Sequence, residues 1–218
     1  MKALVVGATG ETGRRIVQEL VARQIPVKAM VRNLDLGKAV LPPEAELVFG
    51  DVLQPESLKA GMNGCDVVLC ATGARPNLDP SGPLQVDYLG TRNLVDVAKA
   101  QGIQKLVLVS SLCVSQLFHP LNLFWLVLYW KKQAETYLQQ SGLTYTIVRP
   151  GGLKNDDNTE AILLSGPDTL FEGRIPRQKV ASICVEALFQ RSTDNKIVET
   201  VTQPDKPAVP VAELLANF

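Results

Sequence analysis

The feature that most constrains the fold is a glycine-rich stretch near the start of the chain, VVGATGETG from Val5 to Gly13. Gly7, Gly10 and Gly13 follow a short apolar run, Ala3 to Val6, and precede a segment with a helical pattern. A strand that turns directly into a helix needs glycine at the tight turn, where the backbone approaches a pyrophosphate, and where the helix packs on the sheet. The free N–H groups and positive dipole end of the helix then face the anion. The spacing therefore predicts a nucleotide-binding turn.

The residues around this turn decide between nucleotide binding and a merely structural loop, because glycine triplets also occur in ordinary loops. Ile16, Val17 and Leu20 fall on one stripe of a helix, and Val27 to Val31 supplies a second apolar strand. Together these segments form the strand–helix–strand unit that the motif requires. The pattern favours nucleotide binding.

Short apolar, β-branched runs recur along the chain with helical patterns between most of them. The predicted strands are Ala3 to Val6, Val27 to Val31, Glu46 to Phe49, Val67 to Cys70, Leu106 to Ser110 and Tyr145 to Val148. The predicted helices are Glu11 to Arg23, Leu84 to Ala100 and Trp130 to Gln140, with a shorter turn at Glu56 to Ala60. This alternation indicates a parallel sheet covered on both faces. We predict an α/β fold, a Rossmann-type doubly wound parallel sheet.

The 218 residues are expected to form a single domain. Residues 1 to about 150 would be the cofactor-binding core. Residues from about 151 to 218 would form a small C-terminal substrate-side region, with a helix at Val180 to Gln190 and a last strand at Lys196 to Thr202. Ligands of doubly wound sheets bind beyond the carboxyl ends of the strands, which is where this region would lie.

Composition excludes some classes of function. The 22 basic and 22 acidic side chains balance, so the chain has no excess of positive charge of the kind that a nucleic-acid-binding protein needs. Cys65, Cys70, Cys113 and Cys184 are scattered without a CxxC pair, which predicts reduced core thiols and no metal site. The N-terminus enters a strand without an evident export signal, so we expect a cytoplasmic protein, with peripheral membrane association left open.

The tip of the second strand bears on the choice between the two nicotinamide dinucleotides. An NAD site usually has an acidic residue there for the ribose 2′-hydroxyl, whereas an NADP site has a cation for the 2′-phosphate. Here the sequence is MVRN, with Arg32 and Asn33 at the tip. A guanidinium matches phosphate geometry, so we predict NADPH over NADH. Arg32 as a solvated surface charge is the alternative, and Asp35 is expected to cap the next helix.

Several motifs together resemble the atypical short-chain dehydrogenases/reductases. They are VVGATGETG, VRN at Arg32, FGDVLQPESL around Asp51, LCATGA at Thr72, VDYLGTRNLVDVAKAQGIQKLVLVSS to Ser111, and SGLTYTIVRPGGL through Gly152. Within that group the chain resembles the NAD(P)H-binding, NmrA-like branch that contains biliverdin reductase B (flavin reductase) and the dehydrogenase-like subunit of the chloroplast inner-envelope translocon. The resemblance covers about residues 1 to 190.

The resemblance implies a role for each matching position. The dinucleotide loop corresponds to Gly7, Ala8, Thr9, Gly10, Glu11, Thr12 and Gly13. Arg32 corresponds to the 2′-phosphate contact, with Asn33 beside it, and Asp51 and Val52 to the adenine site. Ala71, Thr72 and Gly73 would lie beside the nicotinamide ribose, and Pro150, Gly151 and Gly152 against the nicotinamide. Ser110, at the end of the fifth strand, would also contact the cofactor. Ser111 would be the catalytic residue that orients the acceptor; a strand-end hydroxyl pair with a purely structural role is the alternative for both serines.

The chain also departs from the wider group. Typical short-chain dehydrogenases use a YxxxK pair to protonate a carbonyl, but the nearest spacing here is Tyr129 to Gln133, so carbonyl reduction by that pair is not expected. Lys131 or Lys132 is an alternative, although adjacent lysines on a helix usually form a solvated edge. His119, the only histidine, is interpreted as a loop residue rather than an acid catalyst.

An apolar segment without charged residues runs from Cys113 to Trp130. Its continuous part, Leu123 to Trp130, would be about 12 Å long as a helix, too short for a hydrocarbon core of about 30 Å. A buried or pocket-covering helix is the favoured interpretation, and a protein-docking or membrane-surface patch is the alternative. We expect Phe118, Trp125 and Tyr129 to bind a planar substrate, with ordinary core packing as the alternative for each.

Two hypotheses for the function follow. The first is an NADPH-dependent oxidoreductase that reduces a planar conjugated acceptor, most simply a free flavin bound as substrate, with a linear tetrapyrrole as a further option. The second is a catalytically weak NADPH-binding module that senses redox state or docks a partner through Phe118 to Trp130. Chemistry on a nucleotide sugar is disfavoured because the chain is short and lacks the tyrosine–lysine pair. A monomer or small homo-oligomer is expected.

Overall fold

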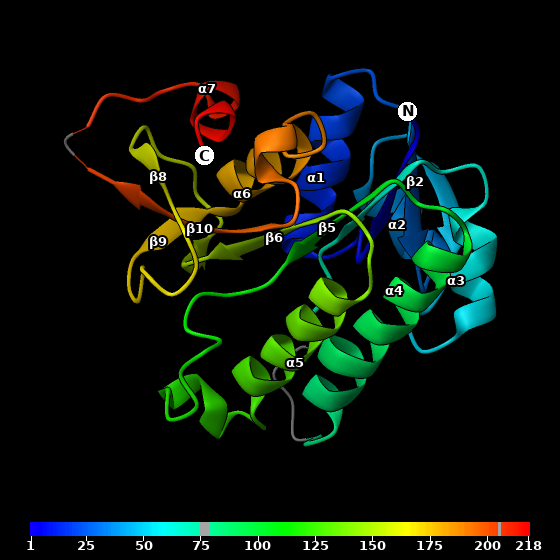
Figure 1. Ribbon diagram of the computed structural model, residues 1–218. Helices are drawn as coiled ribbons and strands as arrows, with labels where there is room; N and C mark the ends of the chain where they lie inside the picture. Colours follow the sequence, from blue (N-terminus) through cyan, green and yellow to red (C-terminus); the bar gives the residue numbers. More distant parts are fainter. Residues whose placement is uncertain (75–78, 205) are drawn as a thin grey trace.

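The computed structural model describes residues 1–74, 79–204 and 206–218, and a central sheet with helices on both faces organises them (Figure 1). Eight strands lie in the order β3-β2-β1-β4-β5-β6-β10-β8 within the described ranges. Their bounds are β1 Ala3–Val6, β2 Val27–Val31, β3 Glu46–Phe49, β4 Val67–Cys70, β5 Lys105–Val109, β6 Tyr145–Pro150, β8 Ala161–Ser165 and β10 Lys196–Gln203. All neighbouring pairs are parallel except β10 with β8. This order confirms the Rossmann-type fold.

The helices divide between the two faces of this sheet. Their bounds are α1 Glu11–Ala22, α2 Leu34–Val40, α3 Pro55–Met62, α4 Gly90–Ala100, α5 Val127–Gln140, α6 Arg177–Glu186 and α7 Val211–Ala216. A π-helical turn η1 (Pro83–Leu89) leads into α4, and 3₁₀ turns lie at η2 (Pro120–Leu123) and η3 (Arg191–Thr193). Helices α1 and α6 cover one face, and α3, α4 and α5 the other (Figure 1).

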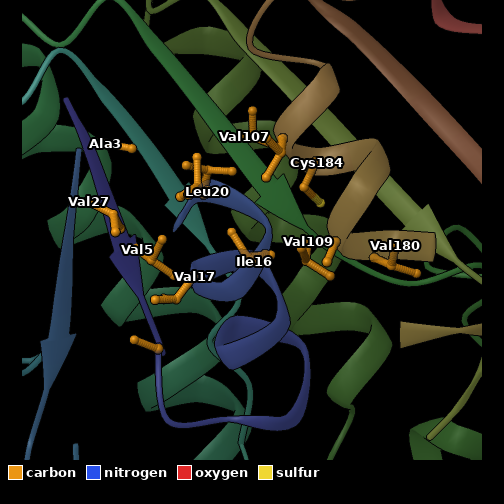
Figure 2. Close-up of a cluster of buried hydrophobic side chains, with 14 of the residues drawn as sticks. Ala3, Val5, Ile16, Val17, Leu20, Val27, Val107, Val109, Val180 and Cys184 are labelled. Carbon is orange, nitrogen blue, oxygen red and sulfur yellow. The ribbon is translucent and has the colours of Figure 1, made fainter. Parts of the chain in front are cut away.

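Successive side chains along a strand point to opposite faces of the sheet, so the buried strands contribute to the hydrophobic cores on both faces. Val107 and Val109 of β5 point toward α1 and α6, where Figure 2 shows them among Ile16, Val180 and Cys184. Their neighbours in β5, Leu106 and Leu108, belong to the cluster under α3, α4 and α5. Because side chains alternate with a period of two, one buried strand serves both faces.

The region after Pro150 contributes to the main sheet as well as to its rim. Strand β10 pairs in parallel with β6, and α6 packs beside α1. A separate two-stranded sheet, β7 (Gly152–Lys154) with β9 (Arg174–Pro176), lies beyond the end of β6. The sequence analysis gave no bounds for α2 and missed β7, β8, β9 and α7, because each of these elements is short.

Two local expectations are wrong. The residue that caps α2 is Asn33, whose side-chain oxygen accepts from Leu36 N at 2.9 Å, and not Asp35, which lies inside the helix. The apolar run from Leu123 to Trp130 is not one buried helix. Pro120 begins a 3₁₀ turn, Trp125 and Leu126 have left-handed backbone (φ 57° and 58°), and α5 starts only at Val127. No helix in the described ranges is long and apolar enough to cross a bilayer.

Candidate functional site

A cleft of about 360 Å³ lies at the carboxyl ends of β1, β2, β3 and β4. Its volume is within the range of small-molecule and cofactor sites. Predicted cofactor residues that line it are Gly7, Thr9, Gly10, Arg32, Asp51, Val52, Ala71, Thr72 and Gly73. The sequence reasoning did not single out the other lining residues, which are Val6, Met30, Val31, Gly50, Leu53, Ala74, Asp79, Gly82, Gln85 and Val86.

The glycine-rich turn forms one end of this cleft. Gly7 has φ +83°, and a β-carbon there would lie 2.8 Å from the carbonyl oxygen of Ala71. A β-carbon on Gly13 would lie 2.1 Å from the carbonyl oxygen of Gly7, so the helix approaches the turn as closely as glycine allows. Gly10 is the N-cap of α1 and has no side chain to accept the N–H groups of the first helical turn. Those donors suit an anion such as a pyrophosphate.

The remaining loop positions serve packing or surface ion pairs. Ala8, Thr12 and Gly13 are buried and do not line the cleft. Glu11 is exposed and pairs with Arg14 at 2.6 Å and with Arg15 at 3.0 Å. These cations hold the pKa of the Glu11 carboxyl below its usual range, with the hydrogen bond from Arg15 as the largest cause.

Arg32 lies on the rim of the cleft at the end of β2. Its side chain is exposed, and within the described ranges its guanidinium makes no hydrogen bond or ion pair. A guanidinium placed this way can receive a phosphate without first breaking a protein contact. Asn33, next to it, uses its side-chain oxygen to cap α2 and does not line the cleft.

The walls beyond Arg32 come from the loop after β3. Asp51 turns this loop by accepting the N–H of Leu53 on its side chain at 2.9 Å. Val52 is buried against Gly90 of α4, where a β-carbon would lie 2.6 Å from the valine side chain. Asn93 fixes the same loop by donating to the Val52 carbonyl at 2.9 Å. Val52 therefore provides an apolar surface, held in place by α4, that suits a planar aromatic ring.

At the other end of the cleft, Lys131 is not part of a solvated edge, which corrects the expectation for the adjacent lysines. Its ammonium lies 2.7 Å from Asp87 Oδ1, and the Lys131 side chain is only 18% exposed. Burial is the largest single influence on this ammonium and lowers its pKa, but Asp87, followed by Cys70 and Glu135, offsets burial, so the pKa is raised above its usual value. Asp87 also accepts from Ala74 N at 3.1 Å, which joins η1 to the end of β4.

A repeated helical spacing in the sequence places each of these two residues on a buried helix face, although it does not show that they pair. Asp87 stands on the stripe of Thr91, Leu94 and Ala98, all buried. A carboxylate on a buried stripe needs a partner of opposite charge. The same reasoning applies to α5, where Lys131 lies one turn before the buried residues Ala134 and Glu135.

The strand-end residues near this inner end do not line the cleft itself. Ser110 is buried and faces a small hollow beside Thr72 and Lys131, and Ser111 is half-buried just beyond β5. Pro150 ends β6, and Gly151 packs so closely that a β-carbon would lie 2.7 Å from the carbonyl oxygen of Gly173. Gly152 N donates to the same oxygen at 2.9 Å.

The predicted substrate-binding aromatics lie apart from the cleft. Phe118 is 97% exposed, and Trp125 and Tyr129 are also exposed, so none of the three is core. Asn122 holds their segment in shape: it donates to the carbonyl oxygens of Gln116 and Leu117 and accepts from the first amides of α5. His119 accepts from Leu121 N, in agreement with a structural loop role.

A sequence profile described as NAD(P)H-binding matches residues 7–191. The chain belongs to this NAD(P)H-binding family. This membership confirms the resemblance to atypical, NmrA-like short-chain dehydrogenases/reductases, a group of NAD(P)H-dependent oxidoreductases. Among the described residues, no cluster of His, Cys, Asp and Glu side chains could hold a metal ion.

Relatives of this NAD(P)H-binding protein include three plant sequences. An uncharacterised chloroplastic protein of Arabidopsis thaliana is 44% identical over 99% of this chain and 82% of its own length. The chloroplastic protein TIC 62 of Pisum sativum is 34% identical over 98% of this chain, which spans only 45% of TIC 62. Sanguinarine reductase of Eschscholzia californica is 31% identical, with 94% of this chain and 90% of the relative covered. The expected cytoplasmic location stays a prediction.

Solved structures share the fold of this NAD(P)H-binding protein over all or nearly all of its length. A Bacillus halodurans protein named for the NAD-dependent epimerases/dehydratases has a TM-score of 0.89 at 27% identity, with all of both chains covered. ChuY of Escherichia coli O157:H7, an anaerobillin reductase, has a TM-score of 0.80 at 25% identity, with 95% of this chain and 100% of ChuY covered.

Proposed function

We propose that the protein is an NADPH-dependent reductase of a planar conjugated acceptor, with a free flavin as the simplest acceptor and a linear tetrapyrrole as a second. The observation that carries this proposal is the cleft that has a glycine turn at one end, an exposed guanidinium on its rim and a buried ion pair behind its inner end. Sanguinarine reductase and the anaerobillin reductase ChuY support the reductase class by their names.

Each part of the cleft suits one part of the dinucleotide. The open amides after Gly10 would bind the pyrophosphate, Arg32 the 2′-phosphate, and the Val52 wall the adenine. Thr72 and Gly73 would hold the nicotinamide ribose. When bound, the reduced nicotinamide supplies the hydride, which is chemistry that no side chain provides.

The protein's own contribution is placement. Ser111, half-buried beyond β5, would donate a hydrogen bond that orients the acceptor over the nicotinamide end of the cleft. The tightly packed Gly151 would keep the opposite wall close to the cofactor. Correct placement of two reactants removes a large part of a barrier, so such a site works without a YxxxK pair.

Purified protein tests this proposal through loss of the reduced-nicotinamide absorbance, with NADPH and NADH in parallel, with and without FMN or riboflavin. The expected result is rapid flavin-dependent oxidation of NADPH and slow oxidation of NADH. Tight NADPH binding without turnover of any flavin or tetrapyrrole would contradict the reductase function and support the second candidate.

The second candidate is an NADPH-binding module that docks a partner protein through the segment from Phe118 to Trp130. The observation that favours it is the exposure of this segment, with Leu123 84% and Phe124 60% exposed on a turn that Asn122 holds in place. A contiguous exposed apolar surface is typical of interaction sites.

Replacement of Leu123 by Glu tests the docking candidate in affinity capture from the source cell. The captured partner should be lost with Leu123→Glu and kept with Phe189→Glu, which alters an exposed apolar residue outside this segment. The same partner captured by both variants would exclude docking through this segment.

A further inference from the structure

A buried ion pair lies directly behind the inner end of the cleft. Asp87 is 1% exposed and Lys131 18% exposed, and their charged atoms lie 2.7 Å apart. A β-carbon added to Gly73 would lie 3.7 Å from Asp87 Oδ1 and 3.8 Å from Lys131 Nζ. The pair therefore lies against the backbone of a residue that lines the cleft, at the end where the nicotinamide is proposed to bind.

A small hollow connects this pair with Ser110. Lys131, Asp87, Thr72 and Ser110 line it, and Thr72 also lines the cleft, so the two spaces adjoin. The volume of the hollow is about 10 Å³, close to the space occupied by one water-sized sphere. The wall combines a cation, a carboxylate and hydroxyls, and such a polar hollow favours water.

The hydroxyl of Ser110 is the observation that points to a bound molecule. Ser110 is only 8% exposed, and among the described protein atoms its Oγ has no hydrogen-bond partner. Buried hydroxyls nearly always have one. An ion pair with a purely structural role would account for Asp87 and Lys131, but it would leave this hydroxyl without a partner.

We propose that the hollow binds one water molecule between Ser110 Oγ and Lys131 Nζ, and that Lys131 supplies through this water the proton that the acceptor needs. The inference rests on the proposed reductase function and adds its proton donor. Ser110 and Asp87 are positioning residues: Ser110 orients the water, and Asp87 holds the ammonium in place and charged.

The proton balance is simple. An acceptor that has gained two electrons and one hydrogen from the reduced dinucleotide carries one negative charge. The water gives a proton to the charged heteroatom of the acceptor and takes one from Lys131 Nζ. The neutral amine beside the Asp87 carboxylate then regains a proton from solvent, so each two-electron reduction consumes one proton.

The surroundings suit this role. Besides Asp87, the titratable groups that act on the ammonium are Cys70 on β4 and Glu135 on α5. Cys70 is a buried thiol whose pKa burial raises, so it carries no charge near neutral pH. Glu135 is engaged by Arg149 at 2.7 Å. Asp87 is therefore the carboxylate that sets the protonation of Lys131.

The first test is independent of activity. A high-resolution crystal structure of the cofactor-free protein should contain one ordered water within hydrogen-bond distance of both Ser110 Oγ and Lys131 Nζ. A closed hollow, or a Ser110 hydroxyl bonded to a protein atom, would overturn the water site. In Ser110→Ala this water should lose order, because one of its partners is gone.

The second test compares Lys131→Ala with Lys132→Ala, the neighbouring lysine on the same helix, with FMN as acceptor. Turnover should fall about 100-fold in Lys131→Ala, NADPH affinity should stay within about threefold, and added ethylamine should restore turnover. Lys132→Ala should retain wild-type turnover. Full turnover in Lys131→Ala, or a loss that ethylamine does not restore, would overturn the proton role.

Ser110→Ala keeps the Asp87–Lys131 ion pair intact, so this variant tests the proton role if Lys131→Ala does not fold. Its turnover should fall about 10-fold, the effect of one lost hydrogen bond, with unchanged NADPH affinity; unchanged turnover would count against the relay. Absence of turnover in the wild-type protein would overturn both the reductase function and the proton role. Equal turnover in the wild-type protein and in all variants would overturn only the proton role of Lys131.

Discussion

Arg149 and Glu135 face each other as a fully buried pair, with Arg149 Nε donating to Glu135 Oε1 at 3.0 Å and Nη2 donating to Oε2 at 2.7 Å. The pair joins α5 to the end of β6, one residue before the Pro150 turn. Burial alone would lower the pKa of Arg149, but Glu135 and the other carboxylate partners raise it, so the guanidinium stays charged. Glu199 is one of those partners, at 3.1 Å.

Glu135→Ala is expected to destabilise the protein by about 3 to 5 kcal/mol, because it leaves a buried guanidinium short of its bidentate partner. Equilibrium unfolding in urea measures this change. Asp35→Ala is the control, since Asp35 is 96% exposed in its pair with Lys38 and its loss should not shift the unfolding midpoint. A Glu135→Ala midpoint equal to that of wild type would show that the pair contributes nothing to stability.

Gly13→Ala should weaken both folding and cofactor binding. The new methyl would lie 2.1 Å from the Gly7 carbonyl oxygen, so helix α1 must move away from the turn. Overpacking of this kind costs about 1 to 3 kcal/mol, and NADPH affinity should fall at least about tenfold. Calorimetric titration measures the affinity, with Gly166→Ala as the control because no atom lies near a β-carbon there. Equal affinities in the two variants would contradict the role of the turn.

Arg32→Ala should weaken NADPH binding about 10- to 100-fold, the loss of one charge-assisted contact. NADH affinity should not change, because NADH lacks the 2′-phosphate. Fluorescence titration with both dinucleotides measures the two affinities. Arg191→Ala, which removes another exposed arginine, is the control. Equal losses for NADPH and NADH would mean that Arg32 does not read the 2′-phosphate.

Ser111→Ala should lower flavin-dependent turnover about 10-fold, as expected for one lost hydrogen bond to the acceptor. The affinity for NADPH should remain nearly that of wild type, since Ser111 does not line the described cleft. Steady-state kinetics and dinucleotide titration together separate the two effects. A variant that no longer binds NADPH would assign Ser111 to the cofactor and not to the acceptor.

The alkaline stability of the protein should depend on Cys184. Burial raises the pKa of this thiol from 9.0 to about 12, so the folded protein retains a proton that the unfolded chain releases. The stability from this thiol is complete below pH 9 and is lost as the pH rises toward 12. The expected slope is about 1.4 kcal/mol per pH unit. Cys184→Ala should show a shallower alkaline decline in urea unfolding; an identical decline would contradict the assignment.

The predictable parts of the fold were the helices and strands whose apolar residues repeat with a fixed period. The strands with continuous apolar runs and helix α1 were found close to their observed bounds, because burial on two faces or on one stripe leaves a regular record in the sequence. Short elements leave no such record. Strand β8, for example, is set by its antiparallel pairing with β10 and not by its own composition.

Part of the cleft was predictable for a different reason. Gly7, Arg32 and Thr72 each follow a predicted strand of a parallel sheet, and the carboxyl ends of such strands meet at one edge. The apolar segment was not predictable in the same way. Left-handed backbone at Trp125 and Leu126 precedes the start of α5 at Val127, and composition does not reveal these two backbone angles.

The sequence by itself determined the topology of the cofactor turn and the charge offered at its rim, because glycine spacing and the identity of Arg32 act locally on backbone and ligand. Only the tertiary structure decided that Lys131 is a buried partner of Asp87 and not a solvated charge. The two residues are far apart in sequence, and a long side chain on a helix edge can point to water or to the interior. Packing of α5 against η1 brings the opposite charges together away from water, where neither is stable alone.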